Sequence, residues 1–277
     1  MSAFGDLSRI NTNLQSMQAL RTLQNNNNEL GMRQLRLSTG SRINRAEDDS
    51  AGYSIAAKIG AKVRGQAQAL SNVGDAKSLL TIAEGSLSTV MEILQTMKEK
   101  TVQAANDTMS STERTAIDNQ LTALSAEVTD ILGDTKFNNT SLFTSTAFSF
   151  QVGAESGDSF SVTVGTLSVA GMSIASGDID VSTAALATSL LSSIDSAITT
   201  ISNKMGSIGD SQKRLTFKQD ALNIAMTNNE AARSRIADAD FAKEQMEIVK
   251  LQILQQTGTA AVAQANAAPQ GILQLLG

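Results

Sequence analysis

The chain has 277 residues, 41% of them hydrophobic, which is enough to bury a sizeable core in one or two domains. It contains no cysteine and no histidine, which excludes disulfides, thiol nucleophiles, zinc or haem ligation by these residues, and imidazole acid–base catalysis. A formal charge of −5, with Lys and Arg spread thinly, argues against binding to nucleic acid.

A helix of about 30 residues is predicted near the N-terminus from helical spacing. Its apolar stripe is Leu7, Ile10, Leu14, Met17 and Leu20. Aromatic residues make up only 3% of the chain and there is one proline, a composition typical of long helices packed through small residues. The first 18 residues lack the basic and continuous apolar regions of a secretory signal peptide. Composition therefore leaves two destinations open, the cytoplasm or export without a cleaved signal.

The stretch RINRAEDDSAG, residues 42–52, mixes charges of both signs directly before the next predicted helix. One interpretation is a solvated loop in which an Asp caps that helix. The other is a connector whose charged side chains form salt bridges.

The next segment carries the strongest periodic signal. Ten positions follow each other in alternating steps of three and four, and nine of them are apolar. They are Val73, Ala76, Leu80, Ala83, Leu87, Val90, Leu94, Met97, Thr101 and Ala104. With a cap near residues 48–50 and a break near 106–111, this seam predicts one coiled-coil helix of about 55 residues, roughly 80 Å long.

Two further helices and a β-hairpin are predicted before the C-terminal region. The first helix carries the apolar series Ile117, Leu121, Leu124, Val128 and Ile131. The second carries Leu190, Ile194, Ala197, Ile201, Met205, Ile208, Leu215 and Leu222. Between them, residues 144–182 alternate apolar and polar on both sides of the turn GAESGDS, which predicts the hairpin. The three helices are expected to pack as an elongated bundle.

The C-terminal segment has no charged residue after Lys250. A stripe through Met246, Val249 and Ile253 predicts a helix of about 35 residues that pairs with the N-terminal helix. A helix that is uncharged on every side is expected to be covered on every side, by other copies of the chain or by a membrane. The alternative is a frayed terminus.

Two smaller features carry little functional signal. The Asp-Ala-Asp at residues 238–240 is a weak metal motif without further acidic support, so a helix cap is the better interpretation. The methionines Met91, Met97, Met205 and Met246 fall at core-like spacing and are interpreted as packing residues.

Six blocks of sequence closely resemble bacterial flagellin, and the resemblance covers nearly the whole chain outside residues 144–182. The blocks are INTNLQSMQALRTL at 10–23, LSTGSRINRAEDDSAGYSIAAKI at 37–59, AEGSL at 83–87, VQAAND at 102–107, SRIADADFAKE at 234–244 and QILQQTGTAAVAQANAAPQGILQLL at 252–276. Six ordered blocks are far more specific than any single short motif.

This resemblance implies a minimal flagellin, mainly α-helical, with paired terminal helices and no large variable outer domain. The implied regions are inner-tube helices at 1–41 and 238–277, a connector at 42–51, an outer-tube bundle at 52–143 and 183–237, and a hairpin region at 144–182. The implied function is that of a structural subunit of the helical bacterial flagellar filament used for swimming, with no enzyme activity and no cofactor.

The resemblance also assigns expected roles to individual residues. Subunit packing in the inner tube is expected at Leu7, Ile10, Leu14, Met17, Val249, Ile253, Leu254, Val262, Ile272, Leu273 and Leu276. Salt bridges between subunits are expected at the connector residues Arg42, Arg45, Asp48 and Asp49. The bundle core is expected at Val73, Leu80, Leu87, Val90, Leu94, Met97, Leu121, Leu124, Val128, Ile201, Ile208 and Leu215.

The implied partners are further copies of the chain, the flagellar export apparatus, a secretion chaperone at the C-terminus, and the filament cap and hook-junction proteins. The implied location is the extracellular filament, reached without a cleaved signal peptide. One departure concerns the innate-immune flagellin receptor of animals. Where receptor-active flagellins present Arg, Leu and Glu, this chain has Thr96, Lys100 and Gln120, so weak receptor binding is expected.

Three alternatives differ in what they predict. A hook-filament junction protein shares the terminal helices but usually departs more from these motifs. A secreted translocator would insert its apolar tail into a membrane, bind liposomes and form no filaments. An enzyme would need a catalytic insertion, and a histidine-free segment of about 40 residues cannot supply the zinc site of a metallopeptidase.

Overall fold

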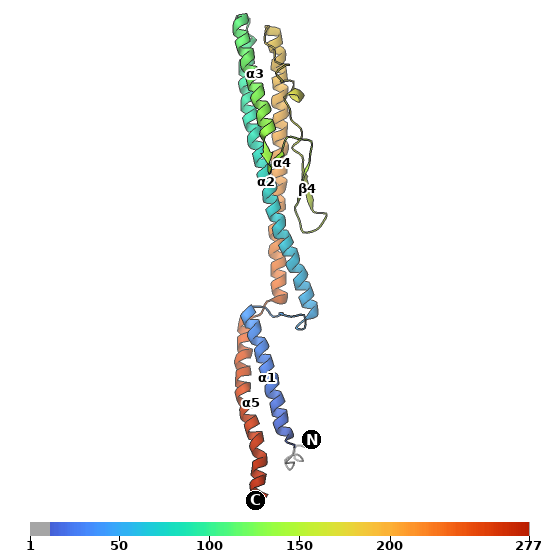
Figure 1. The fold of residues 1–277 in the computed structure, drawn as a ribbon, viewed down its shortest axis with the longest axis vertical. Coiled ribbons are helices and arrows are strands. Elements are labelled where there is room, and N and C mark those ends of the chain that lie inside the picture. Colours follow the sequence, from blue (N-terminus) through green and yellow to red (C-terminus); the bar gives the residue numbers. More distant parts are fainter. Residues whose placement is uncertain (1–11, 277) are drawn as a thin grey trace. The chain divides into compact units, whose positions relative to one another are not determined.

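The computed structural model describes residues 12–276, with side chains described for residues 12–267. Its long helices are α1 (Leu14–Thr39), α2 (Ser50–Ala104), α3 (Ser111–Asp134), α4 (Ala184–Ala237) and α5 (Phe241–Leu276), shown in Figure 1. The mainly helical fold with paired terminal helices and a small hairpin region is confirmed. The chain divides into two compact units, residues 1–61 with 229–277 (unit 1) and residues 62–228 (unit 2).

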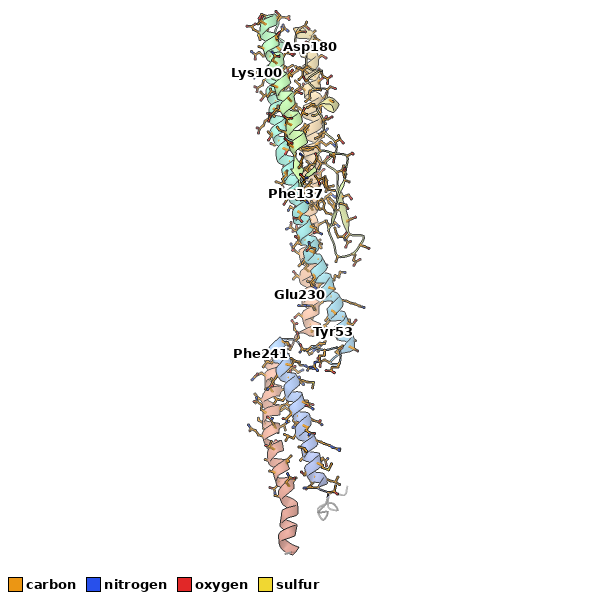
Figure 2. The ribbon with its side chains drawn as sticks, in the orientation of Figure 1. Tyr53, Lys100, Phe137, Asp180, Glu230 and Phe241 are labelled. Carbon is orange, nitrogen blue, oxygen red and sulfur yellow. The ribbon has the colours of Figure 1, made fainter. Side chains whose placement is uncertain are left out.

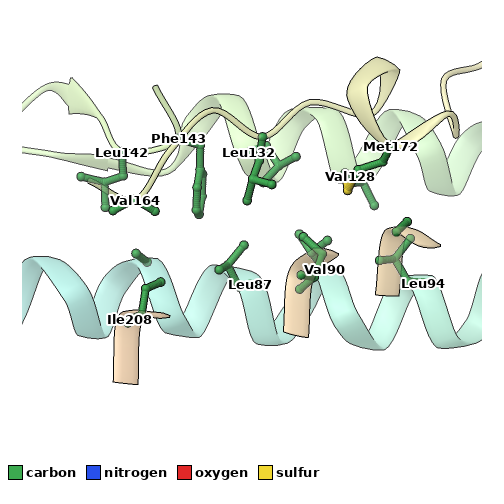
Figure 3. Packing of buried hydrophobic residues seen from close by; sticks show 14 of the residues in the cluster. Leu87, Val90, Leu94, Val128, Leu132, Leu142, Phe143, Val164, Met172 and Ile208 are labelled. Atoms are coloured by element: carbon green, nitrogen blue, oxygen red, sulfur yellow. The ribbon is translucent and has the colours of Figure 1, made fainter. Parts of the chain in front are cut away.

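The core of unit 2 follows the seam of α2. All ten positions of the predicted series from Val73 to Ala104 are buried. Helix α4 runs antiparallel to α2, because Lys98 pairs with Asp195 and Glu84 accepts a hydrogen bond from Gln212. The buried stripe of α4 packs into the same cluster, and Ile208 faces α2 in Figure 3.

Helix α3 begins at a capping box. Ser110 Oγ accepts from the backbone N–H of Glu113, and the Glu113 carboxylate accepts from the Ser110 N–H at 2.8 Å. This reciprocal pair satisfies donors that the first turn leaves free, so the helix starts directly after the turn that ends α2. Its buried positions include Ile117, Leu121 and Val128, which gives the third helix of the bundle.

The segment between α3 and α4 holds two small antiparallel hairpins. The predicted hairpin is confirmed as β3 (Phe148–Gln151) and β4 (Ser159–Val162), with Phe150 opposite Phe160. The second hairpin, β1 (Lys136–Phe137) with β2 (Thr140–Ser141), was not predicted. Its two-residue loop, Asn138 and Asn139, has positive φ at both residues, as a twist-matched hairpin turn requires.

The same segment closes the bundle core. Figure 3 shows Leu142, Phe143, Val164 and Met172 turned toward Leu87, Val90 and Leu94. Met172 belongs to a short 3₁₀ helix, η1 (Ala170–Met172). The hydroxyl of Ser125 donates to the Ile174 carbonyl at 2.7 Å, and this buried bond ties the segment to α3.

The residues expected in the bundle core occupy the following positions. Eleven are buried: Val73, Leu80, Leu87, Val90, Leu94, Met97, Leu121, Val128, Ile201, Ile208 and Leu215. The twelfth, Leu124, is partly buried against the same cluster.

The two units divide the chain at residues 61/62 and 228/229, whereas the resemblance implied a bundle beginning at 52 and ending at 237. The predicted connector, residues 42–51, lies inside unit 1.

Candidate assembly surface

Unit 1 is built around an antiparallel pair of helices, α1 and α5 (Figure 1). Apart from Arg36 and Glu247, the less exposed positions of each helix follow a repeat of alternating three and four residues, as in a coiled coil. In α1 they are Ser16, Ala19, Leu23, Asn26, Leu30, Arg33 and Leu37. In α5 they are Glu244, Ile248, Leu251, Gln255, Gly258, Val262 and Ala265. We refer to these two sets as the pairing seam.

Polar groups fix the register of the pairing seam. Arg33 Nη1 donates to both carboxylate oxygens of Glu244 at 3.0 Å, and Arg36 lies 3.9 Å from the same carboxylate. Glu244 is only 5% exposed, so its charge requires these partners. Gln255 donates to Asn27 at 2.8 Å, and Asn13 donates to the Ala265 carbonyl at 2.7 Å.

Gly258 allows the two helices to approach closely. A Cβ at this position would lie 3.2 Å from Leu23 Cδ1, closer than most carbon contacts in proteins. The glycine therefore matches a leucine across the pairing seam, and a larger residue would push the helices apart.

The stripes expected to pair the two helices face away from the pairing seam instead. Leu14, Met17, Leu20, Val249 and Ile253 are all exposed, and Met246, which was also expected as a packing residue, is 67% exposed. The prediction of pairing is right but the predicted pairing residues are wrong. Both helices carry two apolar stripes, and periodicity alone does not tell which stripe faces the partner within the chain.

Exposed apolar side chains gather in unit 1. Of seventeen large exposed apolar residues in the described part of the chain, twelve belong to unit 1, although it is the smaller unit. They are Leu14, Met17, Leu20, Met32, Leu35, Tyr53, Ile55, Phe241, Met246, Val249, Ile253 and Leu254. Exposed apolar side chains that gather in this way mark an interaction site. We call the ten of them that lie on α1 and α5, all except Tyr53 and Ile55, the apolar face.

The remaining residues expected at the inner-tube packing are placed as follows. Val262 lies half-buried in the pairing seam rather than on the apolar face. Leu7 and Ile10 lie outside the described residues, as do the side chains of Ile272, Leu273 and Leu276.

The connector folds around Asp48. Its Oδ2 accepts from the backbone N–H groups of Asn44 and Arg45, both at 3.0 Å, and its Oδ1 lies 3.9 Å from Arg36 Nη2. The hydrogen bond from Arg45, followed by that from Asn44 and the charge of Arg36, lowers the pKa of the Asp48 carboxyl below its ordinary value. This aspartate stays ionised and holds the loop against α1.

The other charged connector residues have different partners within the chain. Asp49 caps α2 by accepting from the Gly52 N–H at 2.9 Å, as one of the two interpretations predicted. Arg45 pairs with Glu47 at 2.9 Å on the open surface, where such a pair contributes little. Arg42 donates to the Ile236 carbonyl at 2.6 Å, and its backbone N–H donates to Ala237.

The Asp-Ala-Asp stretch serves as a helix start. The Asp240 carboxylate accepts from the backbone N–H groups of Ala242 and Lys243, which caps α5. Among the described residues, no group of three or more acidic, His or Cys side chains could hold a metal ion.

Only α4, of the helices the structure describes, is long and apolar enough to cross a membrane. A single helix of this kind is weak evidence for a membrane-spanning segment. The leucines and isoleucines Leu190, Ile194 and Ile201 of α4 are buried in the bundle of unit 2, so we interpret its composition as that of a bundle helix.

Comparison with known families decides the identity. Residues 10–147 match the bacterial flagellin N-terminal helical region, and residues 191–276 match the bacterial flagellin C-terminal helical region. The chain belongs to the bacterial flagellin family. This flagellin is a structural subunit of the flagellar filament and not an enzyme.

Relatives of full length support the assignment. The flagellin of Halalkalibacterium halodurans is 38% identical over 269 residues, which span 96% of this chain and 99% of the relative. Flagellin FlaB1 of Treponema pallidum is 33% identical over 284 residues, with the same coverage of each chain. These relatives favour a filament subunit over a hook-filament junction protein or a translocator.

A solved structure shows the same fold at low sequence identity. It is a protein assigned as a flagellar hook-associated protein from Vibrio parahaemolyticus, with a TM-score of 0.60 and 14% identity. The match covers 69% of this flagellin and all of that chain. The shared fold is the finding here, since the identity is too low to carry function.

Proposed function

We propose that this flagellin polymerises through the apolar face, with α1 and α5 of each copy packed against α1 and α5 of its neighbours. The observation that carries the proposal is the placement of the apolar face on the outside of the helix pair. The pairing seam already satisfies the contact between the two helices, so the apolar face needs a second partner. Contacts that do not close on themselves produce an open helical polymer.

The absence of charge after Lys250 supports this assignment. Burial of apolar surface stabilises an assembly by roughly 25 cal/mol per Å², and the uncharged part of α5 after Lys250 can contact several neighbours. We assign Leu7, Ile10, Leu14, Met17, Val249, Ile253, Leu254, Ile272, Leu273 and Leu276 to these contacts.

Connector residues provide a second set of contacts in this proposal. Arg42 has no carboxylate within ion-pair distance among the described residues, so its charge is available to a neighbouring copy. Arg45 is exposed and its bond to Glu47 is easily exchanged. Asp48 and Asp49 hold the loop that presents these two cations.

The route to the filament follows from the same apolar face. Before assembly, the uncharged part of α5 after Lys250 needs a cover, and a secretion chaperone would supply it inside the cell. The proposed route is export through the flagellar apparatus without a cleaved signal, with assembly beneath the filament cap and above the hook-junction proteins. Thr96, Lys100 and Gln120 support weak binding to the innate-immune receptor, and a receptor reporter assay showing full potency of the monomer would contradict that.

Seeded polymerisation tests the proposal. Three chains are compared: the full-length chain, residues 1–267, which keep the described pairing seam, and residues 1–250, which lose five of its seven positions on α5. Each is dissociated, returned to neutral buffer with short filament seeds, and followed by sedimentation and negative-stain microscopy. Filaments from the full-length chain alone would support the contacts assigned to Ile272, Leu273 and Leu276. Filaments from residues 1–267 as well, but not from residues 1–250, would support the apolar face without these three residues. If all three chains polymerise, the tail is not the polymerisation element; if none does, the filament function is contradicted and liposome binding becomes the next measurement.

A further inference from the structure

Three methionines lie on the apolar face, and they are the most exposed methionines among the described residues. Met246 is 67% exposed, and Met17 and Met32 are each 48% exposed. Each is three residues away from another member of the apolar face on the same helix, so each thioether has an exposed apolar neighbour on its side of the helix. The sulfur atoms therefore belong to the surface that the proposed polymer buries.

The methionines of unit 2 are shielded by comparison. All six are buried or partly buried: Met91, Met97, Met109, Met172, Met205 and Met226. An oxidant in solution therefore reaches the three methionines of the apolar face before it reaches those of the bundle.

The composition of the chain makes methionine its principal target for a peroxide, because there is no cysteine, tryptophan or histidine. In this reaction a lone pair of the thioether sulfur forms an S–O bond to one peroxide oxygen, and the O–O bond breaks. The departing hydroxide takes the proton of the transferred oxygen and leaves as water. The sulfur is oxidised and the peroxide is reduced. The product, methionine sulfoxide, is polar where methionine is apolar.

A sulfoxide on the apolar face has different consequences for the free chain and for the polymer. None of the three methionines belongs to the pairing seam, so α1 and α5 keep their contact and water solvates the new oxygen. In a contact with a neighbouring copy, the oxygen would be buried among apolar side chains such as Leu20 and Val249. A buried acceptor without a donor is costly, so oxidation opposes assembly and not folding.

The three methionines are spread along the helix pair. Met246 lies five residues after Phe241, which marks the start of α5 in Figure 2. Met32 directly precedes Arg33, which reaches across the pairing seam to the same end of α5. Met17 is fifteen residues earlier on α1, about 22 Å along the helix axis. Oxidation therefore interrupts the apolar face at two separated places.

We propose that Met17, Met32 and Met246 are a modification site, at which oxidation to methionine sulfoxide by a peroxide blocks assembly of the free subunit. This inference rests on the proposed function, since it assigns a redox control to the apolar face. Assembly in turn protects the three side chains, because the contact that their oxidation would weaken also covers them. Reduction of the sulfoxides restores the subunit to the assembling state.

Peroxide treatment of the free subunit tests the inference. The dissociated wild-type chain is treated with dilute hydrogen peroxide and quenched, and the oxidation of each methionine is measured by mass spectrometry of its peptides. The three methionines of the apolar face should be converted before those of unit 2. The critical concentration for seeded polymerisation should rise about tenfold or more, because a buried acceptor without a donor is costly. Thermal unfolding of the monomer should stay close to that of the untreated chain.

Reversal and substitution provide the controls. Incubation with dithiothreitol and the two methionine sulfoxide reductases, one for each epimer, should restore the critical concentration, and this chain has no disulfide for the reductant to break. A triple variant, Met17→Leu with Met32→Leu and Met246→Leu, keeps the apolar volume without the sulfur and should polymerise before and after peroxide. The matched variant Met91→Leu with Met205→Leu should stay as sensitive as wild type. Both variants keep Met1, which lies outside the described residues.

Three outcomes would overturn the inference. One is a triple variant that loses assembly to peroxide as wild type does. Another is a wild-type chain that is oxidised at all three positions and keeps its critical concentration. The third is oxidation of the three methionines as fast in finished filaments as in the free chain. In each case the untreated chain still polymerises, so the filament function stands. Failure of the untreated wild-type chain to form filaments would instead overturn the proposed function.

Discussion

Ile253→Ala should weaken polymerisation without weakening the monomer. Ile253 is 56% exposed on the apolar face and contributes nothing to the pairing seam. Burying a whole isoleucine side chain contributes about 1.5–3 kcal/mol, so roughly half of that, about 0.8–1.5 kcal/mol, remains for a contact with a neighbouring copy. Since 1.4 kcal/mol is a factor of ten in an equilibrium constant, the critical concentration should rise about fourfold to twelvefold.

The assay measures the concentration of unpolymerised chain above pelleted filaments at equilibrium, alongside thermal unfolding of the monomer. Leu251→Ala is the matched control, since Leu251 is two residues away but only 3% exposed in the pairing seam. It should destabilise unit 1 by about 2–5 kcal/mol. An unchanged critical concentration for Ile253→Ala, in a monomer with wild-type unfolding, would refute the assignment of the apolar face.

Three further predictions concern stability of the monomer. The lowered pKa of Asp48 stabilises the fold above its ordinary value of 3.8, and this contribution is lost as the pH falls through the folded-state pKa. Asp48→Asn should therefore unfold more easily than wild type at pH 7, and the difference in denaturant midpoint should shrink as the pH is lowered below 3.8; a difference that stays constant as the pH falls would contradict this. Leu94→Ala removes a fully buried side chain and should lower the free energy of unfolding, measured with guanidinium, by about 2–5 kcal/mol. A decrease of less than about 1 kcal/mol would argue against the described core. Gly52→Ala would place a Cβ 2.8 Å from Ile43 Cδ1 and should lower the melting temperature. Gly74→Ala would meet no atom within 4 Å and should raise the stability of the folded chain by about 1 kcal/mol. Changes in melting temperature of the same sign for both variants would refute the steric argument.

The sequence predicts the bundle of unit 2 well, because the apolar residues of α2 can be buried in only one way. The series from Val73 to Ala104 forms a single apolar stripe, and the opposite face of α2 is largely polar, so the stripe had to face the core. The β3–β4 hairpin was predicted equally well, because apolar and polar residues alternate along both strands. The β1–β2 hairpin was missed, although Asn138 and Asn139 carried a usable signal, because asparagine tolerates positive φ.

The helix pair of unit 1 is harder to read from sequence. Each helix has a stripe for its partner within the chain and another for the proposed neighbours, and the second stripe is the more apolar. Val249 and Ile253 therefore look like core residues, while the actual pairing seam includes Glu244 and Gln255. Which polar residues are buried depends on cross-helix partners such as Arg33, far away in sequence.

The pairing of α1 with α5 also sets the order in which the molecule folds. Asn13 and Ala265, which share a hydrogen bond, are 252 residues apart in the chain, so a newly made α1 has no partner until synthesis is nearly complete. Closing so long a loop in an unfolded chain is entropically costly and slow. Unit 2 contains its own local contacts and should form first. Its antiparallel α2 and α4 then bring both ends of the chain to the same end of that bundle, which shortens the search between α1 and α5. Unit 1 therefore folds last, and a released chain that ends before residue 241 would hold a complete bundle with an unpaired first helix.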